Sequence, residues 1–372
     1  MLRADGAPLA MQTRSDPTVL LGNVRIAAFP VRGCEAAVPA GTAVLLLDDK
    51  RLPLPPRELQ RIVVIGDTGC RLQGPLAVQD CNDPDAWPYA KIVAQVVASR
   101  PDLVLHVGDY HYREIECPPG RSGCEGSPHG FGWDVWNADF FLPSAPLLAA
   151  APWLLLRGNH EDCDRAGEGW FRFLAAAPMP DRCADLTGFF VSRVGAMGFV
   201  MMDGAKAVDD SPNPDALIQT LRRQLAEVRD AIPAEAWLMT HRPMNAMRSG
   251  FENGPDTVEN RIQQAAIGDQ LPPGVRMAIS GHNHFFQVLD FAGARPPQLV
   301  VGISGDNLVP IPREPLVGKE VNGARVVAAA ARYGFGYMVW DKADSGWDGT
   351  LFDENGKRVR RCRLAERRLT CE

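Results

Sequence analysis

The sequence lacks the features that would assign it to several common classes of protein. It contains no apolar run long enough to cross a bilayer, and residues 1–17 lack the positive start and apolar stretch of a secretion signal. The GxSxG motif of serine hydrolases is absent, as is the GxxxxGK phosphate loop of ATPases. These absences disfavour a membrane span, a serine hydrolase and a P-loop ATPase.

Basic residues are also fewer than acidic ones in the sequence, 39 against 45. Its formal net charge is -6, and nucleic acids are bound through clusters of Lys and Arg, so we expect no nucleic-acid partner. The 372 residues are 46% hydrophobic and 23% charged, which is typical of a folded globular protein. Any phosphate that the protein handles is therefore expected to be a small group.

Cysteine, in contrast, is abundant. The nine cysteines favour disulfides and an oxidising compartment, so we expect a periplasmic or secreted protein. This expectation requires that a secretion signal has been removed, and reduced thiols remain the alternative. Connectivity stays open, although eight of the cysteines are neighbours in sequence that would close short loops, with Cys34 left over: Cys70 and Cys81, Cys117 and Cys124, Cys163 and Cys183, Cys362 and Cys371.

The composition changes near residue 58. Residues 1–50 carry short apolar runs at Thr18–Leu21 and Thr42–Leu47, broken by Gly and Pro, which indicates a few strands or an irregular extension. The LPLPP stretch at 52–56 cannot continue a helix or a central strand. We therefore predict an N-terminal extension at residues 1–58 and a catalytic domain at residues 59–372.

From residue 59 onward, apolar strand-like runs alternate with segments of helical period. This alternation predicts an α/β domain, in which helices cover the sheets. We expect helices at Tyr89–Ser99, Ala138–Ala150 and Pro214–Ile232, and strands at Ile62–Ile65, Leu103–Val107, Trp153–Leu156, Trp237–Thr240, Val275–Ser280, Gly336–Trp340, Gly346–Phe352 and Arg358–Leu364.

Five of these predicted strands end in polar residues that bind metals well. Each short motif is weak alone, because Gly-Asp after a strand is an ordinary turn. Together they are informative, since strand ends of an α/β sheet converge on one site and first-row metals prefer carboxylate and imidazole ligands. The five motifs are GDTG at 66–69, GDYHY at 108–112, GNHE at 158–161, MTH at 239–241 and GHNH at 281–284.

These five motifs resemble the blocks of the calcineurin-like metallophosphoesterases. The first block of that superfamily usually reads Asp-x-His, whereas Gly69 replaces the histidine here. Purple acid phosphatases share this loss and use a tyrosine three residues after the second aspartate, where Tyr112 stands. The resemblance covers about residues 60–310, and it implies a four-layer sandwich of two mixed β-sheets flanked by helices.

The resemblance further implies two metal ions and their ligands. One ion would be bound by Asp67, Asp109, Tyr112 and His284. The second would be bound by Asp109, which bridges the two ions, together with Asn159, His241 and His282. A phenolate ligand favours ferric iron at the first site, and the second ion would be zinc, iron or manganese.

The implied activity is hydrolysis of a small phosphate ester, with phosphomonoesters expected first. A hydroxide held by the metals would attack phosphorus in line, and His160 would assist the leaving group. A phosphodiesterase or nucleotide hydrolase on the same site is the alternative, and a non-catalytic binding module is a third hypothesis.

Three neighbouring residues have open roles. His111 could contact substrate or face away from it. Glu161 could orient His160, although an acidic residue at a helix start is an equally ordinary explanation. Arg242 could face the phosphate or lie on the surface.

Overall fold

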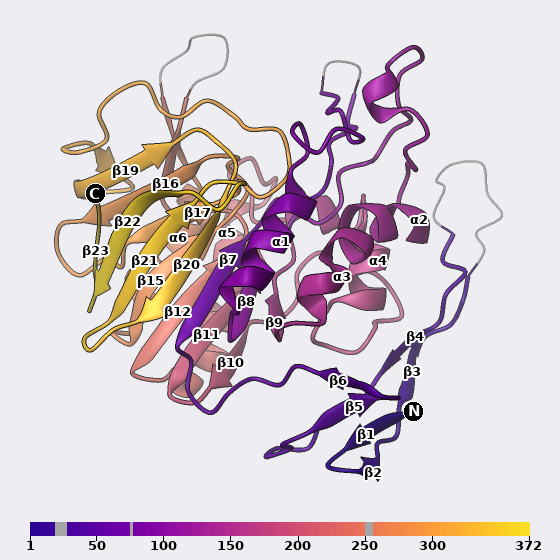
Figure 1. The fold of residues 1–372 in the computed structure, drawn as a ribbon. Coiled ribbons are helices and arrows are strands. Elements are labelled where there is room, and N and C mark those ends of the chain that lie inside the picture. Colours follow the sequence, from indigo (N-terminus) through magenta and orange to yellow (C-terminus); the bar gives the residue numbers. More distant parts are fainter. Residues whose placement is uncertain (19–27, 75–76, 250–255) are drawn as a thin grey trace.

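Two large β-sheets form the centre of the protein in its computed structural model (Figure 1). The structure describes residues 1–18, 28–74, 77–249 and 256–372. Within these ranges one sheet has eight strands and the other has seven. Both sheets mix parallel and antiparallel neighbours, so the predicted α/β fold with two mixed sheets is confirmed.

The seven-stranded sheet leads into the first three motifs. Its strands β7 (Arg61–Ile65), β8 (Leu103–His106) and β9 (Trp153–Leu155) are parallel neighbours, and the first two are buried apolar runs as expected for strands covered on both faces. The strand order is β23-β22-β21-β20-β7-β8-β9. The antiparallel strands are β20 (Tyr337–Lys342), β21 (Trp347–Phe352), β22 (Arg358–Ala365) and β23 (Arg368–Cys371).

The eight-stranded sheet leads into the last two motifs. Strands β12 (Glu235–Thr240) and β15 (Val275–Ser280) lie side by side and parallel, so their carboxyl ends reach the same edge. The strand order is β10-β11-β12-β15-β17-β16-β19-β18. The remaining members are β10 (Phe190–Val194), β11 (Met197–Met202), β16 (Phe286–Phe291), β17 (Gln298–Val301), β18 (Glu320–Val321) and β19 (Ala324–Arg332).

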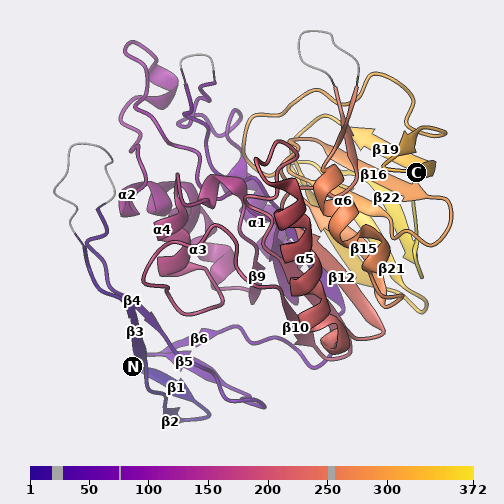
Figure 2. The same cartoon turned by 180° about the vertical axis from the view of Figure 1, so that it is seen from behind.

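Helices cover the outer faces of the two sheets, and the main core lies between the sheets. In that core Trp237 packs edge to face against Trp340 and Trp347, with ring centroids 5.9 and 5.3 Å apart. Helices α1 (Tyr89–Ser99) and α3 (Leu142–Leu148) cover the seven-stranded sheet. Helices α5 (Pro214–Val228) and α6 (Arg261–Ile267) cover the other (Figure 2). The fold is therefore the predicted four-layer sandwich.

The helix expected at Ala138–Ala150 differs from the prediction. Helical structure begins earlier, at α2 (Trp133–Trp136), continues through a π-helical turn η2 (Asn137–Phe141) and ends with α3. Proline lacks a backbone N–H, and Pro146 lies inside α3, so a regular α-helix cannot continue undisturbed through this segment. The other short elements are η1 (Ser122–Cys124), η3 (Asn159–Glu161), α4 (Gly167–Phe173), η4 (Arg229–Ala231), η6 (Gly268–Gln270), β13 (Ala246–Arg248) and β14 (Thr257–Glu259).

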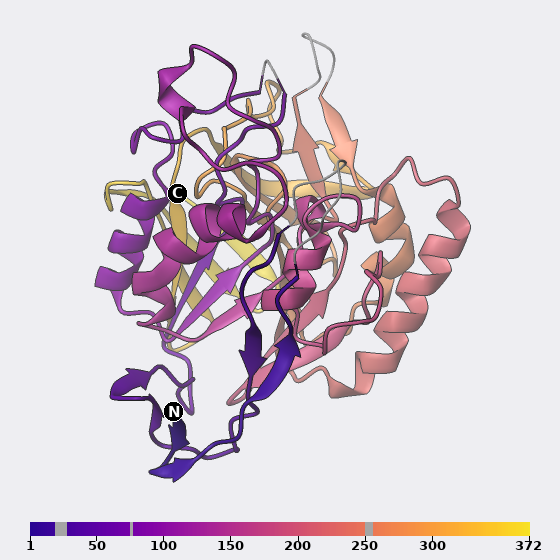
Figure 3. The ribbon, with the colours of Figure 1, turned by 90° about the vertical axis from the view of Figure 1, so that its right-hand side faces the viewer.

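The N-terminal residues form small sheets outside the two large ones (Figure 3). Arg14 donates to the carbonyls of Phe171 and Ala177, and Arg172 donates to the carbonyl of Asp16, so this part contacts α4. Part of the expected Thr18–Leu21 strand, residues 19–21, lies outside the described residues. The strands are β1 (Leu2–Ala4), β2 (Ala7–Pro8), β3 (Gln12–Ser15), β4 (Gly33–Glu35), β5 (Leu45–Leu47) and β6 (Lys50–Leu52).

Four disulfides link the cysteines that are neighbours in sequence, and Cys34 is free and exposed. The expectation of disulfides is thus confirmed. Among the described helices, none combines the length and the apolar character needed to cross a membrane. The bonds are Cys70–Cys81, Cys117–Cys124, Cys163–Cys183 and Cys362–Cys371.

Candidate functional site

The five motifs meet at one edge of the two sheets, because each follows the carboxyl end of a strand. Three of the predicted ligands adopt the left-handed backbone conformation that non-glycine residues rarely take: Asp67 has φ of 55°, Asp109 of 59° and His282 of 68°. Backbone strain of this kind, about 1–3 kcal/mol each, persists only where the surrounding structure enforces it and is concentrated at functional sites.

Glycines in the motifs allow the loops to approach one another closely. A Cβ at Gly108 would lie 2.6 Å from Nδ1 of His241 and 2.8 Å from the Cα of Gly158. A Cβ at Gly158 would collide with the Asp109 carboxylate, and one at Gly281 would collide with that of Asp67. The glycines before Asp109, Asn159 and His282 are therefore required by the neighbouring loops, and Gly108 is required also by its own φ of 99°.

The first predicted ligand group is assembled around the hydroxyl of Tyr112. This oxygen lies 3.2 Å from Oδ1 of Asp67, 2.8 Å from Oδ2 of Asp109 and 3.1 Å from Nε2 of His284. Nε2 of His284 is also 3.2 Å from Oδ1 of Asp67. All four side chains are buried. The structure thus brings together the four residues that the resemblance assigns to the first metal.

The donors and acceptors in this group fit a cation. Nδ1 of His284 donates to the carbonyl of Asn307 at 2.7 Å, which leaves Nε2 of a neutral ring as an acceptor. Nε2 and two carboxylate oxygens then converge on a hydroxyl that has a single proton to donate. Buried acceptors that face one another without enough protons are costly, and a bound metal ion would satisfy them.

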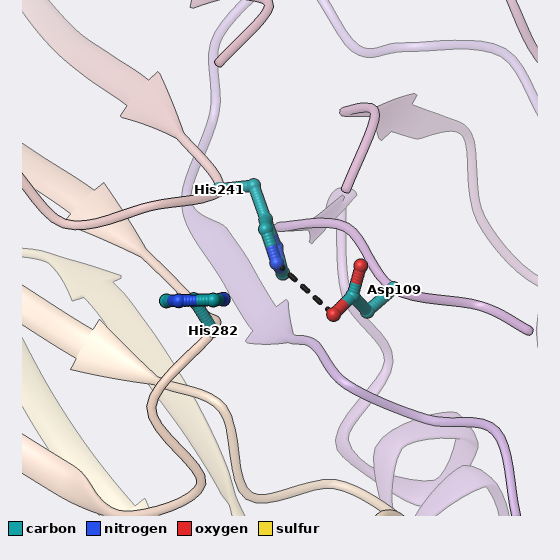
Figure 4. Close-up of side chains that lie close together, drawn as sticks. All are labelled: Asp109, His241 and His282. Carbon is teal, nitrogen blue, oxygen red and sulfur yellow. Dashed lines mark ion pairs between the residues drawn. The ribbon is translucent and has the colours of Figure 1, made fainter. Parts of the chain in front are cut away.

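The second predicted group shares Asp109 with the first. Nε2 of His241 lies 3.1 Å from Oδ2 of Asp109 and 3.1 Å from Oδ1 of Asn159. His282 stands beside them, and the ligand atoms of Asp109, His241 and His282 all lie within 4.8 Å of one another. Figure 4 shows the His241 ring directed at the Asp109 carboxylate, with His282 next to it.

This second group also consists of converging acceptors. Nδ1 of His241 donates to the carbonyl of Val107 at 2.8 Å, so Nε2 of the neutral ring faces two oxygens as an acceptor. Burial lowers the pKa of His241, but the Asp109 and Asp67 carboxylates outweigh burial and raise this pKa to about 9. The carboxylates therefore favour a positive charge at Nε2 of His241, which either a proton or a metal ion could supply.

Glu161 supports the backbone of the ligand loops. Its Oε2 accepts from the N–H groups of Asp109 and Gly158, both at 3.0 Å. Its Oε1 accepts from the N–H groups of Tyr110 at 2.8 Å and His111 at 3.2 Å. Burial and the Asp109 carboxylate raise the pKa of Glu161 to about 8, while the backbone donors oppose this rise. One carboxylate thus joins the second motif to the third, a role different from the suggested orientation of His160.

The His160 imidazole has other partners. Its Nδ1 lies 2.9 Å from Oε1 of Glu114, and Nη2 of Arg165 lies 2.7 Å from the same nitrogen. Its Nε2 lies 4.0 Å from Oδ2 of Asp109, and its ring packs on Tyr112 with centroids 3.9 Å apart. Burial is the main reason that the pKa of His160 lies well below its usual value, and Arg165 adds to this effect. His160 therefore stands next to both ligand groups.

The structure does not bring His111 to the two ligand groups. Its ring is fully buried against Phe131 and Trp136, with centroids 5.5 and 5.9 Å away, and burial lowers its pKa to about 4. Arg242 does reach the site, since its Nη1 donates to Nε2 of His282 at 2.9 Å. Of the three residues with open roles, Glu161 and Arg242 thus contact the ligand loops, and His111 lies in an aromatic cluster.

Four residues of the site were missed by sequence reasoning. Glu114 follows the GDYHY motif by two positions, and Arg165 follows His160 by five, but neither spacing is distinctive. Arg71 pairs with Asp306, which in turn lies 3.3 Å from Nδ1 of His284. Asp306 also follows a strand, β17, and this placement is the one signal that could have found it.

The ligand groups open into a cavity of about 720 Å³. One part of its lining comes from Asp109, Asn159, His160, His282 and His284, so four of the seven predicted ligands reach this cavity. Another part consists of basic and apolar residues from surrounding loops: Arg71, Arg165, Arg248, Arg313, Ala77, Leu308, Val309 and Pro310.

The family model of the calcineurin-like phosphoesterases matches residues 60–286. This is more than half of the chain, so the protein belongs to the calcineurin-like phosphoesterase family, whose members are generally metal-dependent hydrolases and typically bind two metal ions. The resemblance seen in the five motifs is therefore confirmed. The comparison with curated proteins gave no match.

Solved structures similar to this chain share its fold at low sequence identity. A purple acid phosphatase, PPD1 from yellow lupin seeds, is 15% identical with a TM-score of 0.52, over 88% of this chain and 58% of the lupin chain. PhoD is 12% identical with a TM-score of 0.54, over 92% of this chain and 74% of PhoD. GAP50 of Plasmodium is 12% identical with a TM-score of 0.50, over 83% of this chain and 89% of the GAP50 chain. This chain thus spans little more than half of the lupin protein.

Proposed function

We propose that this protein hydrolyses small phosphate esters, with phosphomonoesters as the first expected substrates, at a pair of metal ions. The observation that carries this proposal is the convergence of two acceptor groups on Oδ2 of Asp109, which lies 2.8 Å from the Tyr112 hydroxyl and 3.1 Å from Nε2 of His241. A carboxylate shared by two such groups is suited to bridging two ions, which sites of this kind hold about 3.5–4 Å apart.

The residues would divide between the two ions as the family resemblance implies. Asp67, Tyr112 and His284 would hold one ion, Asn159, His241 and His282 the other, and Asp109 both. When bound, the ions would supply Lewis-acid polarisation of the phosphate and activation of water. A phenolate and two carboxylates favour a hard ion such as ferric iron at the first site, with zinc, iron or manganese at the second.

The side chains around the ions would then orient the substrate and move a proton. Glu114 accepts from Nδ1 of His160, which leaves Nε2 on the side of Asp109. When the ring is protonated on both nitrogens, Nε2–H is the group that can pass a proton or a hydrogen bond to the leaving oxygen. Glu161 holds the loop of Asp109 through backbone N–H groups, so the ligand atoms stay in place while the substrate reacts.

Further parts of the proposal concern the whole chain. Among the described residues, every one that lines the cavity lies at position 71 or later, which supports a catalytic domain at residues 59–372 and an extension at 1–58. Four disulfides support a periplasmic or secreted location. Gly69 and Tyr112 support a purple acid phosphatase-like site.

Metal content and hydrolysis, measured on the same preparation, test the function. We expect about two metal ions per chain, and hydrolysis of p-nitrophenyl phosphate faster than that of bis(p-nitrophenyl) phosphate. Asp109→Asn removes the shared carboxylate charge and is expected to lose both metal and activity. Hydrolysis of the diester alone would favour a phosphodiesterase, and a metal-loaded protein without either activity would refute the proposal.

A further inference from the structure

Two arginines stand in the cavity beside the predicted ligands, and neither belongs to the five motifs. Arg71 follows the first motif and Arg165 follows the third, and both line the cavity together with Asp109, Asn159 and His160. Their side chains are only 18% and 19% exposed. Arginine this deep in a cavity is fixed in place more strongly than a surface arginine, so its orientation is informative.

Arg165 is held through one nitrogen of its guanidinium. Its Nη2 makes an ion pair with Oε1 of Glu114 and lies 2.7 and 3.0 Å from the two ring nitrogens of His160. Within the described part of the chain, its contacts all run through this one nitrogen. A guanidinium has five N–H groups, so the groups on Nε and Nη1 remain for a ligand.

Arg71 is held beside the Tyr112 ring. Its Nε donates to Asp306 at 2.9 and 3.0 Å, its Nη2 pairs with the same carboxylate, and its Nη1 donates to Gln73 at 2.5 Å. Its guanidinium carbon lies 4.8 Å from the centroid of the Tyr112 ring. These bonds use three of the five N–H groups, so two remain for a ligand at the cavity.

Both arginines are therefore positioned before any substrate arrives. A guanidinium N–H can donate a charge-assisted hydrogen bond to a phosphate oxygen. Because Glu114 and Asp306 already fix the two guanidiniums, substrate binding does not have to order them, and the entropy cost of binding is smaller. Both arginines therefore line the same cavity as four of the predicted ligands, with N–H groups left to donate.

We propose that Arg71 and Arg165 bind the non-bridging oxygens of a dianionic phosphomonoester and so set the preference of the site for monoesters over diesters. This inference rests on the proposed function. A monoester dianion carries two charges on three non-bridging oxygens, whereas a diester carries one charge on two such oxygens. The second ester group of a diester leaves the pair of guanidiniums short of acceptors.

The kinetic test compares single variants on two substrates. Arg165→Met and Arg71→Met are expected to lower kcat/KM for p-nitrophenyl phosphate by about 10- to 100-fold, the range for a charge-assisted hydrogen bond, and kcat/KM for bis(p-nitrophenyl) phosphate by less than about threefold. Arg165→Lys and Arg71→Lys keep the charge without the guanidinium N–H groups, and they serve if a Met variant fails to fold. Arg223→Met, on α5 with a single bond to Thr220, is the matched control.

A binding measurement separates contact with phosphate from an effect through His160. Inorganic phosphate is titrated into the metal-loaded protein, and its dissociation constant is measured by calorimetry. We expect Arg165→Met to weaken phosphate binding about tenfold or more, in the wild-type background and again in a His160→Ala background. An arginine that acts only by positioning His160 would have no effect once His160 is removed.

Equal losses on the monoester and the diester, or unchanged phosphate binding in the His160→Ala background, would overturn the inference. Either result would leave the proposed function standing, provided that the wild-type protein hydrolyses phosphate esters. An inactive wild-type protein with its metals bound would instead refute the proposed function itself.

Discussion

Replacement of His160 by alanine gives the sharpest test of how the site works, because its effect depends on the leaving group. Nε2 of His160 lies 4.0 Å from Oδ2 of Asp109, and the ring packs on Tyr112, so it can reach an ester oxygen bound next to the shared carboxylate. His160 is not a predicted ligand, so the variant is expected to keep its metals.

The expected magnitude follows from proton transfer by a positioned side chain. Such transfer contributes about 10²- to 10⁴-fold in rate, which is about 2.7–5.4 kcal/mol in the activation barrier. We expect His160→Ala to lose this full amount with an alkyl phosphate such as β-glycerophosphate, whose alkoxide leaves poorly without a proton. With p-nitrophenyl phosphate the loss is expected to be about tenfold or less, since p-nitrophenolate needs little assistance.

The assay is steady-state turnover of both substrates, with metal content determined on each preparation. Glu114→Gln tests the partner of His160, because an amide is a weaker acceptor for Nδ1–H, and we expect a smaller loss with the same dependence on the leaving group. His129→Ala is the control, since His129 lines a different cavity. Equal losses on the two substrates, with both metals retained, would refute the assignment of His160 to the leaving group.

Three further predictions concern the support of the site. Glu161→Gln puts an amide NH₂ where backbone N–H groups point, so we expect it to destabilise the protein by about 2–4 kcal/mol and to weaken metal binding; urea unfolding and metal titration measure this, and wild-type values in both would contradict it. Tyr112→Phe is expected to abolish visible absorption if iron is bound, and a spectrum equal to that of the wild type would exclude this tyrosine as a ligand. Replacing Cys163 and Cys183 by serine opens a loop with a sequence separation of 20 and is expected to cost about 3 kcal/mol in stability, with the Cys362 and Cys371 double variant for comparison; an unchanged unfolding midpoint would contradict it.

Much of the fold could be predicted because it depends on local pattern. Helix α1 has the predicted bounds, Tyr89–Ser99, since its apolar residues recur at helical spacing between a proline and a left-handed residue, Arg100. The strands before the motifs were recognisable as apolar runs. The segment around Pro146 was less predictable, because its helical turns depend on packing as well as on propensity.

The site could be predicted only where residues belong to a motif. Arg71 and Arg165 occupy loops whose direction depends on tertiary contacts, and the sequence alone does not distinguish them from surface arginines. The partner of the His160 imidazole is Glu114, which lies far from it in sequence. His111 shows the reverse, since a histidine between two motif residues faces an aromatic cluster.

The glycines that precede the ligands make distant parts of the chain depend on one another. A side chain at Gly108, in the second motif, would collide with His241, in the fourth motif. We therefore expect a substitution at one of these glycines to displace a predicted ligand that belongs to another motif.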